Sequence, residues 1–360
     1  MPNPHNSIIP PLWTLLFFGI GLLLGGCSES SSTSQSGAAD PPKLHYYTWS
    51  DYVDPEILAA FESSRGVRVV VDTFSSNEEL LAKIQTGMIG YDVVVPSDFM
   101  AGIMGRLGLL AMLDLSRIPH VQDLERHLTN LPFDPTQEFA IPYLWGTVGI
   151  GYNAEVVTTV PTSWNVLWDP QYSGRISMLN DQREVFGLAL RSLGYSLNSR
   201  EPRFIQQAKE RLIRQKPLVK AYTSEQFDQL LVSGDVVLAH AWGGPVARAM
   251  REDPSIRYAI PREGGTIWTD CLAVLASSKQ KELAMDFMNY LLSEPVALQT
   301  SKRLLFASAN RYVRQQLPPE IRNNLAVYPP DDVLPRMEWM EDVQEATRDY
   351  DRAWTELKVH

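Results

Sequence analysis

The stretch from residue 44 to residue 95 alternates between strand and helix patterns, and this alternation limits the possible folds more than any other feature. Leu44–Thr48, Val67–Phe74 and Asp92–Val95 are expected to be strands because they are rich in apolar and β-branched residues. The two segments between them carry helix signals. A β-α-β-α-β order predicts a parallel sheet with helices packed on its faces.

Both helices have recognisable ends in the sequence. Asp54 precedes Pro55, which is typical of an N-cap followed by proline at the first helical position. Gly66 is expected to end this helix, which runs to about residue 64. Ser76 and Glu79 have the spacing of a capping box and predict a second helix that ends near residue 87.

A second series of strands and helices is expected further along the chain. Its strands are predicted at Gly149–Asn153, Arg175–Leu179 and Val236–Ala241, and helices are predicted at Val185–Leu193, Pro202–Arg214, Ser224–Val232, Glu282–Leu292 and Asp342–Leu357. The glycine-rich segment Ile141–Gly151 lies between the two series and is the expected first crossing between two lobes.

The N-terminus reads as a targeting signal and is kept apart from the fold. Leu12–Leu24 is apolar but shorter than the roughly 20 residues that span a membrane. It ends in Leu24-Gly25-Gly26-Cys27, which resembles a bacterial lipobox, although no Lys or Arg precedes it. This predicts a signal peptide over 1–26, a lipidated Cys27 and a Ser-rich tether over 27–40. An ordinary secretory signal is the alternative.

Composition excludes several kinds of function. Removal of residues 1–26 leaves 334 of the 360 residues, which is long for one core and favours two lobes. The net charge of −10 disfavours nucleic acid as a partner. If Cys27 carries lipid, Cys271 is the one remaining cysteine, so no disulfide is expected. Metal-ligand spacing and phosphate-binding loops are absent from the sequence, so no metal and no cofactor are expected.

Aromatic residues and carboxylates follow the predicted strands. Ligands of open α/β sheets bind at the carboxyl ends of strands, so these residues are candidates for a site. They are Trp49, Ser50, Asp51 and Tyr52 after the first strand, Pro96, Ser97, Asp98 and Phe99 after the third, Asn180, Asp181 and Glu184 after Arg175–Leu179, and Trp242 after Val236–Ala241. Aromatic faces and carboxylates together suit an elongated organic cation.

Each of these groups also has a structural interpretation. Asp181 and Glu184 have the spacing of a helix start, so Asp181 either caps a helix or faces a ligand, and both roles can coexist. Trp49 and Trp242 are equally compatible with the core. Alternation would place Trp268 and Asp270 on one face of a strand, although an ordinary turn with a surface acid remains an alternative there.

Several strings of the chain resemble the periplasmic spermidine/putrescine-binding proteins of ABC importers. These strings are YTWSDYVDP, VVVPS, PFDP, IPYLWGTVGIGYN, DQREVF, REGGTIWTD, NYLLSEPVA and VYPPDDV. The resemblance extends over nearly the whole chain from about Leu44 to the C-terminus. The resemblance implies a two-lobed periplasmic binding protein fold of type II. Each lobe would be a mainly parallel sheet flanked by helices and hinged by crossing strands. Lobe one would span 41–147 plus 270–308, and lobe two 148–269 plus 309–360.

The resemblance also implies the residues that bind the ligand. They are Trp49, Asp51, Tyr52, Ser97, Phe99, Asp181, Glu184, Trp242, Trp268, Asp270 and Phe306. Three positions depart from the family pattern. Phe306 replaces the usual tyrosine, Met340 replaces a glutamine of the spermidine binder, and Pro245 replaces an aspartate of the putrescine binder.

The implied function is capture of a polyamine outside the cytoplasm and delivery to an ABC permease, with spermidine as first choice and putrescine as second. The protein would be a monomer that touches the membrane through its lipid anchor only, and it would catalyse no reaction. Two rival functions remain open. One is a polyamine-responsive receptor component, and the other is an extracytoplasmic hydrolase that uses Asp181 and Glu184 as acid and base.

Overall fold

The computed structural model describes residues 40–87 and 90–360. The predicted signal peptide, Cys27 and the tether up to residue 39 lie outside the described residues. The body Pro41–His360 is one unit. None of its described helices combines the length and the apolar composition that crossing a bilayer requires.

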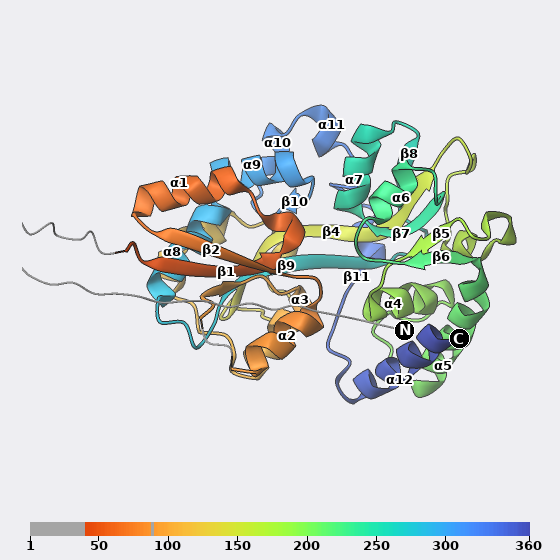
Figure 1. Cartoon of the computed structure of the whole chain (residues 1–360), viewed down its shortest axis with the longest axis horizontal. Helices are drawn as coiled ribbons and strands as arrows, with labels where there is room; N and C mark the ends of the chain where they lie inside the picture. The colour runs from red at the N-terminus through yellow and green to blue at the C-terminus, as the bar shows by residue number, and fades with distance from the viewer. Residues whose placement is uncertain (1–39, 88–89) are drawn as a thin grey trace, which may run out of the picture. The chain divides into compact units, whose positions relative to one another are not determined.

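The first lobe is built around the predicted β-α-β-α-β segment. Strand β1 (Lys43–Trp49) lies between β2 (Arg68–Phe74) and β3 (Val93–Val94) and pairs parallel with both, which confirms the predicted sheet. Strands β1 and β2 lie side by side in Figure 1. Alternate side chains pack into different clusters, with Tyr46 in one and Tyr47 in the other. The sheet of this lobe is therefore buried on both faces, as expected of parallel strands.

The predicted helix ends are present. The Asp54 side chain caps α1 (Pro55–Arg65) by accepting from the Glu56 amide at 3.0 Å, and Gly66 ends it with φ 62°. Ser76 caps α2 (Asn77–Gln85), but Glu79 accepts from the amide of Ser75 at 2.9 Å, one residue earlier than a capping box requires.

The second lobe repeats this arrangement. Strand β5 (Ile176–Met178) lies between β6 (Val219–Tyr222) and β7 (Leu238–Trp242) and pairs parallel with both. Its larger helices are α4 (Gln182–Ser192), α5 (Pro202–Gln215), α6 (Phe227–Val232) and α7 (Gly243–Glu252).

Two long strands run side by side through both lobes (Figure 1). The first half of β4 (Ala140–Asn153) pairs antiparallel with β9 (Thr266–Val274), and its second half pairs with β7 and β8 (Ile256–Ala259). The strands join in the order β2-β1-β3-β9-β4-β7-β5-β6. The outer strands of each lobe are therefore parallel, and the strands that cross between the lobes pair antiparallel with their neighbours in this order. The predicted crossing segment lies inside β4.

The remaining elements complete the two lobes. They are α3 (Asp98–Arg106), α8 (Lys281–Leu292), α9 (Glu294–Leu304), β10 (Ala307–Ser308), α10 (Val313–Gln316), α11 (Pro319–Arg322), β11 (Glu338–Trp339) and α12 (Thr347–Val359).

Two predicted helix starts were too early. The helix predicted from Ser224 begins at Phe227 because Gln226 has a left-handed φ of 60°. The helix predicted from Asp342 begins at Thr347 because a short 3₁₀ turn precedes it.

Candidate functional site

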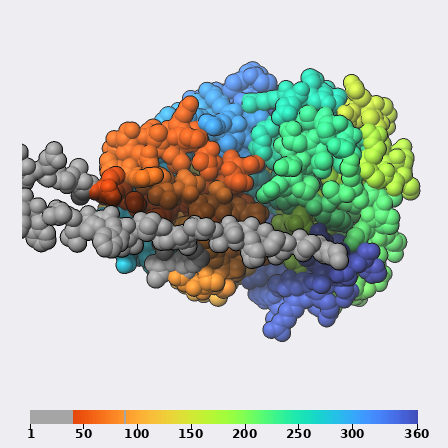
Figure 2. Space-filling view, in the orientation of Figure 1, coloured from red at the N-terminus to blue at the C-terminus, as the bar shows by residue number. Residues whose placement is uncertain are grey.

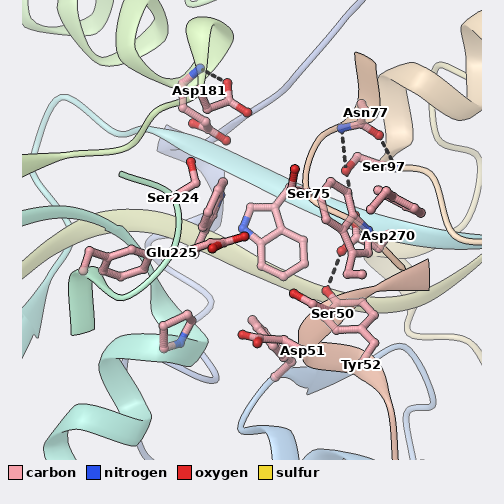
Figure 3. A pocket seen from close by; sticks show the side chains of 18 of the residues that line it. Ser50, Asp51, Tyr52, Ser75, Asn77, Ser97, Asp181, Ser224, Glu225 and Asp270 are labelled. Atoms are coloured by element: carbon pink, nitrogen blue, oxygen red, sulfur yellow. Dashed lines mark hydrogen bonds between the residues drawn. The ribbon is translucent and has the colours of Figure 1, made fainter. Parts of the chain in front are cut away.

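A cavity of about 580 Å³ lies where strand ends and loops of both lobes meet (Figure 3). All eleven residues predicted to bind a ligand line it: Trp49, Asp51, Tyr52, Ser97, Phe99, Asp181, Glu184, Trp242, Trp268, Asp270 and Phe306. The structure thus brings together residues that are up to about 260 positions apart in the chain. Their contact with a ligand stays a prediction.

Asp270 is a buried carboxylate held by two hydroxyl groups. Ser97 donates to its Oδ1 atom at 2.7 Å, and the Tyr52 hydroxyl donates to its Oδ2 atom. Asn77 in turn fixes Ser97 through two hydrogen bonds of 3.1 Å (Figure 3). Burial raises the pKa of Asp270 to about 6, and the two hydroxyl bonds oppose that rise.

Asp181 both caps α4 and lines the cavity. Its Oδ1 atom accepts from the Glu184 amide at 2.9 Å, which confirms the helix cap, whereas its contact with a ligand stays a prediction. Thr266 donates to the Glu184 carboxylate at 2.7 Å. Burial, followed by the charge of Asp181, raises the pKa of Glu184 to about 8, and burial also raises the pKa of Asp181. Neither acid forms an ion pair with a described residue, although the charge of the neighbouring Arg183 opposes the rise in both pKa values.

Two further acids of the cavity, Glu225 and Asp228, were not predicted, and a third, Asp98, was a strand-end candidate that was not assigned to the ligand. Glu225 and Asp228 lie after β6, a strand that was missed in the sequence; the strand-end rule would otherwise have found them. The left-handed backbone at Gln226 separates Glu225 from helix α6. Asp98 follows β3 and is almost fully buried, and burial raises its pKa well above the ordinary value. The cavity lining therefore contains seven carboxylates.

Aromatic rings make up much of the remaining wall. The rings of Trp268 and Phe306 meet edge to face with centroids 5.7 Å apart, and Tyr52 meets Phe306 at 5.4 Å. Glycines make this packing possible: a Cβ on Gly146 would lie 2.6 Å from the Trp268 ring, and one on Gly244 would lie 2.3 Å from the Phe306 ring. The aromatic wall thus depends on glycine at positions 146 and 244, where a side chain would collide with a ring.

Arg248 is the basic residue of the cavity lining, and the sequence interpretation missed it. Helix α7 begins directly after Trp242 and places Pro245 and Arg248 on the cavity wall. The guanidinium pairs with Asp51 at 2.6 Å. On the face seen in Figure 2, orange residues of the first lobe lie against green residues of the second. Because of the ion pair with Arg248, Asp51 already has a cationic partner.

No group of three or more His, Cys, Asp or Glu side chains in residues 40–87 and 90–360 has the arrangement of a metal site. Cys271 is buried and free. Met340 and Pro245, two positions that depart from the family pattern, both line the cavity.

Comparisons with known proteins agree with this architecture. The chain matches the family model of bacterial extracellular solute-binding proteins over residues 56–327. The spermidine/putrescine-binding periplasmic protein of Escherichia coli K12 is 35% identical over 339 residues, covering 94% of this chain and 97% of that protein. The putrescine-binding periplasmic protein PotF of the same strain is 34% identical over 343 residues, covering 89% and 92%.

A solved structure extends the likeness to the fold. The substrate-binding protein PotD of a spermidine/putrescine ABC transporter from Streptococcus pneumoniae is 32% identical and superposes with a TM-score of 0.78, covering 88% of this chain and 99% of that one. The chain therefore belongs to the family of bacterial extracellular solute-binding proteins.

Proposed function

We propose that this protein captures a polyamine in the cavity outside the cytoplasm and delivers it to an ABC permease. The observation that carries the proposal is the composition of the cavity wall, where seven carboxylates and a single arginine alternate with aromatic rings. The names of the relatives support the same ligand class. The proposal assigns binding and no catalysed reaction.

The energetics of the wall favour ammonium groups. Burial makes ionised Glu184 and Asp270 unfavourable in the empty cavity, as their raised pKa values indicate. A ligand ammonium would offset this cost by pairing with each carboxylate. The methylene chain would pack on rings such as Trp268, and these rings attract cations on their faces.

Binding would also bring the two lobes together. Asp270 accepts hydrogen bonds from first-lobe residues, whereas Asp181 and Glu184 belong to α4 of the second lobe. A ligand that pairs with both sets is bound more tightly when the lobes are close, and that difference in affinity drives closure. The permease would then recognise the closed form.

The N-terminal sequence supports the location. The string Leu24-Gly25-Gly26-Cys27 and the Ser-rich segment after it fit a lipid anchor followed by a tether. The folded body would then work at the membrane surface as a monomer. We also propose that the chain passes from one lobe to the other after residues 147, 269 and 308.

Spermidine is proposed before putrescine because its additional ammonium group can use more of the carboxylates. Asp181 and Glu184 offer a pair of acids at one end, and Asp270 offers a further one. The calorimetric titration of both ligands at the same pH and salt tests the order. Putrescine bound at least about tenfold tighter, a difference of about 1.4 kcal/mol, would reverse it.

A thermal-shift screen of the purified protein tests the function itself. A polyamine at about 100 times its dissociation constant should stabilise the fold by roughly 2.7 kcal/mol. Amino acids and sugars serve as the comparison ligands and should leave the melting temperature unchanged. No shift with spermidine, putrescine or a related diamine would refute the proposal.

A further inference from the structure

The Asp51 end of the cavity already contains a cation that belongs to the protein. Arg248 donates to Asp51 Oδ2 at 2.6 Å and to the carbonyl of Leu304 at 3.2 Å, and its guanidinium carbon lies 5.9 Å from the Phe306 ring centroid. All three partners belong to the first lobe, whereas Arg248 belongs to α7 of the second. The guanidinium is therefore held in one place by groups on three sides.

A second acid lies within reach of the same charge. Asp228 on α6 lines the cavity, and burial raises its pKa, while the charge of Arg248 opposes the rise and the charge of Asp51 adds to it. Without Arg248, this end would present two carboxylates with no cation between them. Two such acids would form a receptor for a ligand ammonium.

The other end of the cavity differs in this respect. Asp181 and Glu184 receive hydrogen bonds from a backbone amide and from a hydroxyl group, and neither forms an ion pair with a described residue. The charge of the buried Arg183 acts on both acids, but its guanidinium donates to the Glu341 carbonyl and to the Asn198 side chain instead. Ammonium groups of a ligand can therefore pair there without displacing a protein cation. At the Asp51 end, an ammonium would have to displace Arg248 or lie beside a like charge, which is costly in a partly buried site.

We propose that Arg248 is a specificity-determining residue that limits how many ammonium groups the cavity accepts, so that polyamines longer and more highly charged than the preferred ligand are disfavoured. This inference rests on the proposed function, because it concerns selection among polyamines. It goes beyond that function by assigning the selectivity to one ion pair.

The same ion pair joins the two lobes, and the experiment must separate this effect from selectivity. Loss of a contact between lobes weakens every ligand that requires closure, by a common factor. Loss of a resident cation strengthens a ligand with more ammonium groups relative to one with fewer. The ratio of two affinities cancels the common factor and isolates the second effect.

Calorimetric titration of spermine and putrescine into wild type, Arg248→Met, Arg248→Lys and the Asp51→Asn plus Arg248→Met double variant measures this ratio. Methionine keeps an aliphatic stem beside Phe306 and removes the charge, whereas lysine keeps the charge. The spermine preference should rise about tenfold in Arg248→Met, stay near wild type in Arg248→Lys and fall back in the double variant. Arg251→Met is the matched control, because Arg251 is an exposed residue of the same helix outside the cavity lining.

The possible failures are distinguishable. An unchanged ratio in Arg248→Met, with both affinities reduced alike, would show that the ion pair serves closure alone and would overturn the inference. A rise of the same size in Arg251→Met would overturn it as well, since net charge would then be the cause. Absence of polyamine binding by the wild type would refute the proposed function and this inference with it.

Discussion

The two ends of the cavity hold their acids in opposite ways. At the α4 end, Asp181 and Glu184 are held by an amide and a hydroxyl group, and burial raises the pKa of both. At the other end, Asp51 is exposed and paired with Arg248. The comparison teaches that counting carboxylates overstates how many ligand charges a site can receive, because one carboxylate already has its cation.

Asp270 belongs neither to the Asp181–Glu184 pair nor to the Asp51–Arg248 ion pair. Its replacement should weaken polyamine binding more than any other change described below. We expect Asp270→Asn to weaken polyamine binding by roughly 2–4 kcal/mol, because a buried ammonium would lose its charged partner. Calorimetry measures the loss. The exposed Asp332→Asn serves as the control for the change of net charge. A loss below about tenfold would mean that the two ends bind the ligand without a central acid.

Glu184→Gln should separate binding from stability at the α4 end. The folded pKa of about 8 lies above the ordinary value of 4.5, so the empty protein loses stability as the pH rises from about 4.5 to about 8, because the carboxyl group ionises in the unfolded chain while the folded site keeps it protonated. The variant should bind polyamine about tenfold more weakly or worse, yet unfold at a higher temperature than the empty wild type at pH 8.

Melting curves at two pH values test this sign. The stabilising effect of Glu184→Gln should shrink at pH 5, where the wild-type carboxyl is protonated in the folded state. Asp51→Asn should give no such gain, since Asp51 is exposed and ion-paired. A Glu184→Gln protein that is less stable than wild type at pH 8 would contradict the expected cost of the buried charge.

Polyamine affinity should fall as the pH is lowered from 8 to 5. The empty site takes up protons with pKa values of about 8 at Glu184 and about 6 at Asp270, and each proton must leave before an ammonium pairs. A loss of about tenfold or more is expected over this interval. Calorimetry in buffers of different ionisation enthalpy should detect protons released on binding, and Glu184→Gln should release fewer. Release that is unchanged in that variant would contradict the assignment.

The smallest expected effect concerns Met340. This buried residue follows β11, lines the cavity and is one of the positions that depart from the family pattern, in which a glutamine is expected. Met340→Gln would add an amide oxygen that can accept from an ammonium, and a gain of about 0.5–1.5 kcal/mol in spermidine binding is expected. Met337→Gln, a buried change outside the cavity lining, is the matched control. Equal effects at both positions would show that polarity alone is responsible.

The sequence predicted which strands are parallel and which residues line the cavity better than it predicted which of these residues pair with one another. Capping signals around Asp54 and Gly66 are local, so the chain near them determines the helix ends. Strand ends likewise place Trp49 and Asp181 without knowledge of distant residues. Strand β6 has a weak sequence signal and was not predicted, so Glu225, which follows it, was not among the candidate site residues.

The Asp51–Arg248 pair could not be predicted in this way. Its two members are 197 positions apart, and nothing near Arg248 in the sequence distinguishes it from Arg251. The choice between them depends on the start of α7, where two glycines follow Trp242 without the usual capping side chain. Gly243 lies against the Ala326 backbone and Gly244 lies against the Phe306 ring, and both approaches are tertiary constraints.

The excess of carboxylates in the cavity has a kinetic consequence. The cavity lining has seven carboxyl groups against one arginine, and those that are ionised concentrate a negative potential at the entrance because the surrounding wall has a low dielectric constant. Free polyamine should therefore arrive faster than diffusion to a neutral site allows, and the association rate should fall steeply as ionic strength rises. Dissociation depends on desolvated contacts inside and should respond far less to salt. In a saline medium the protein would then capture its ligand more slowly while retaining it for a similar time.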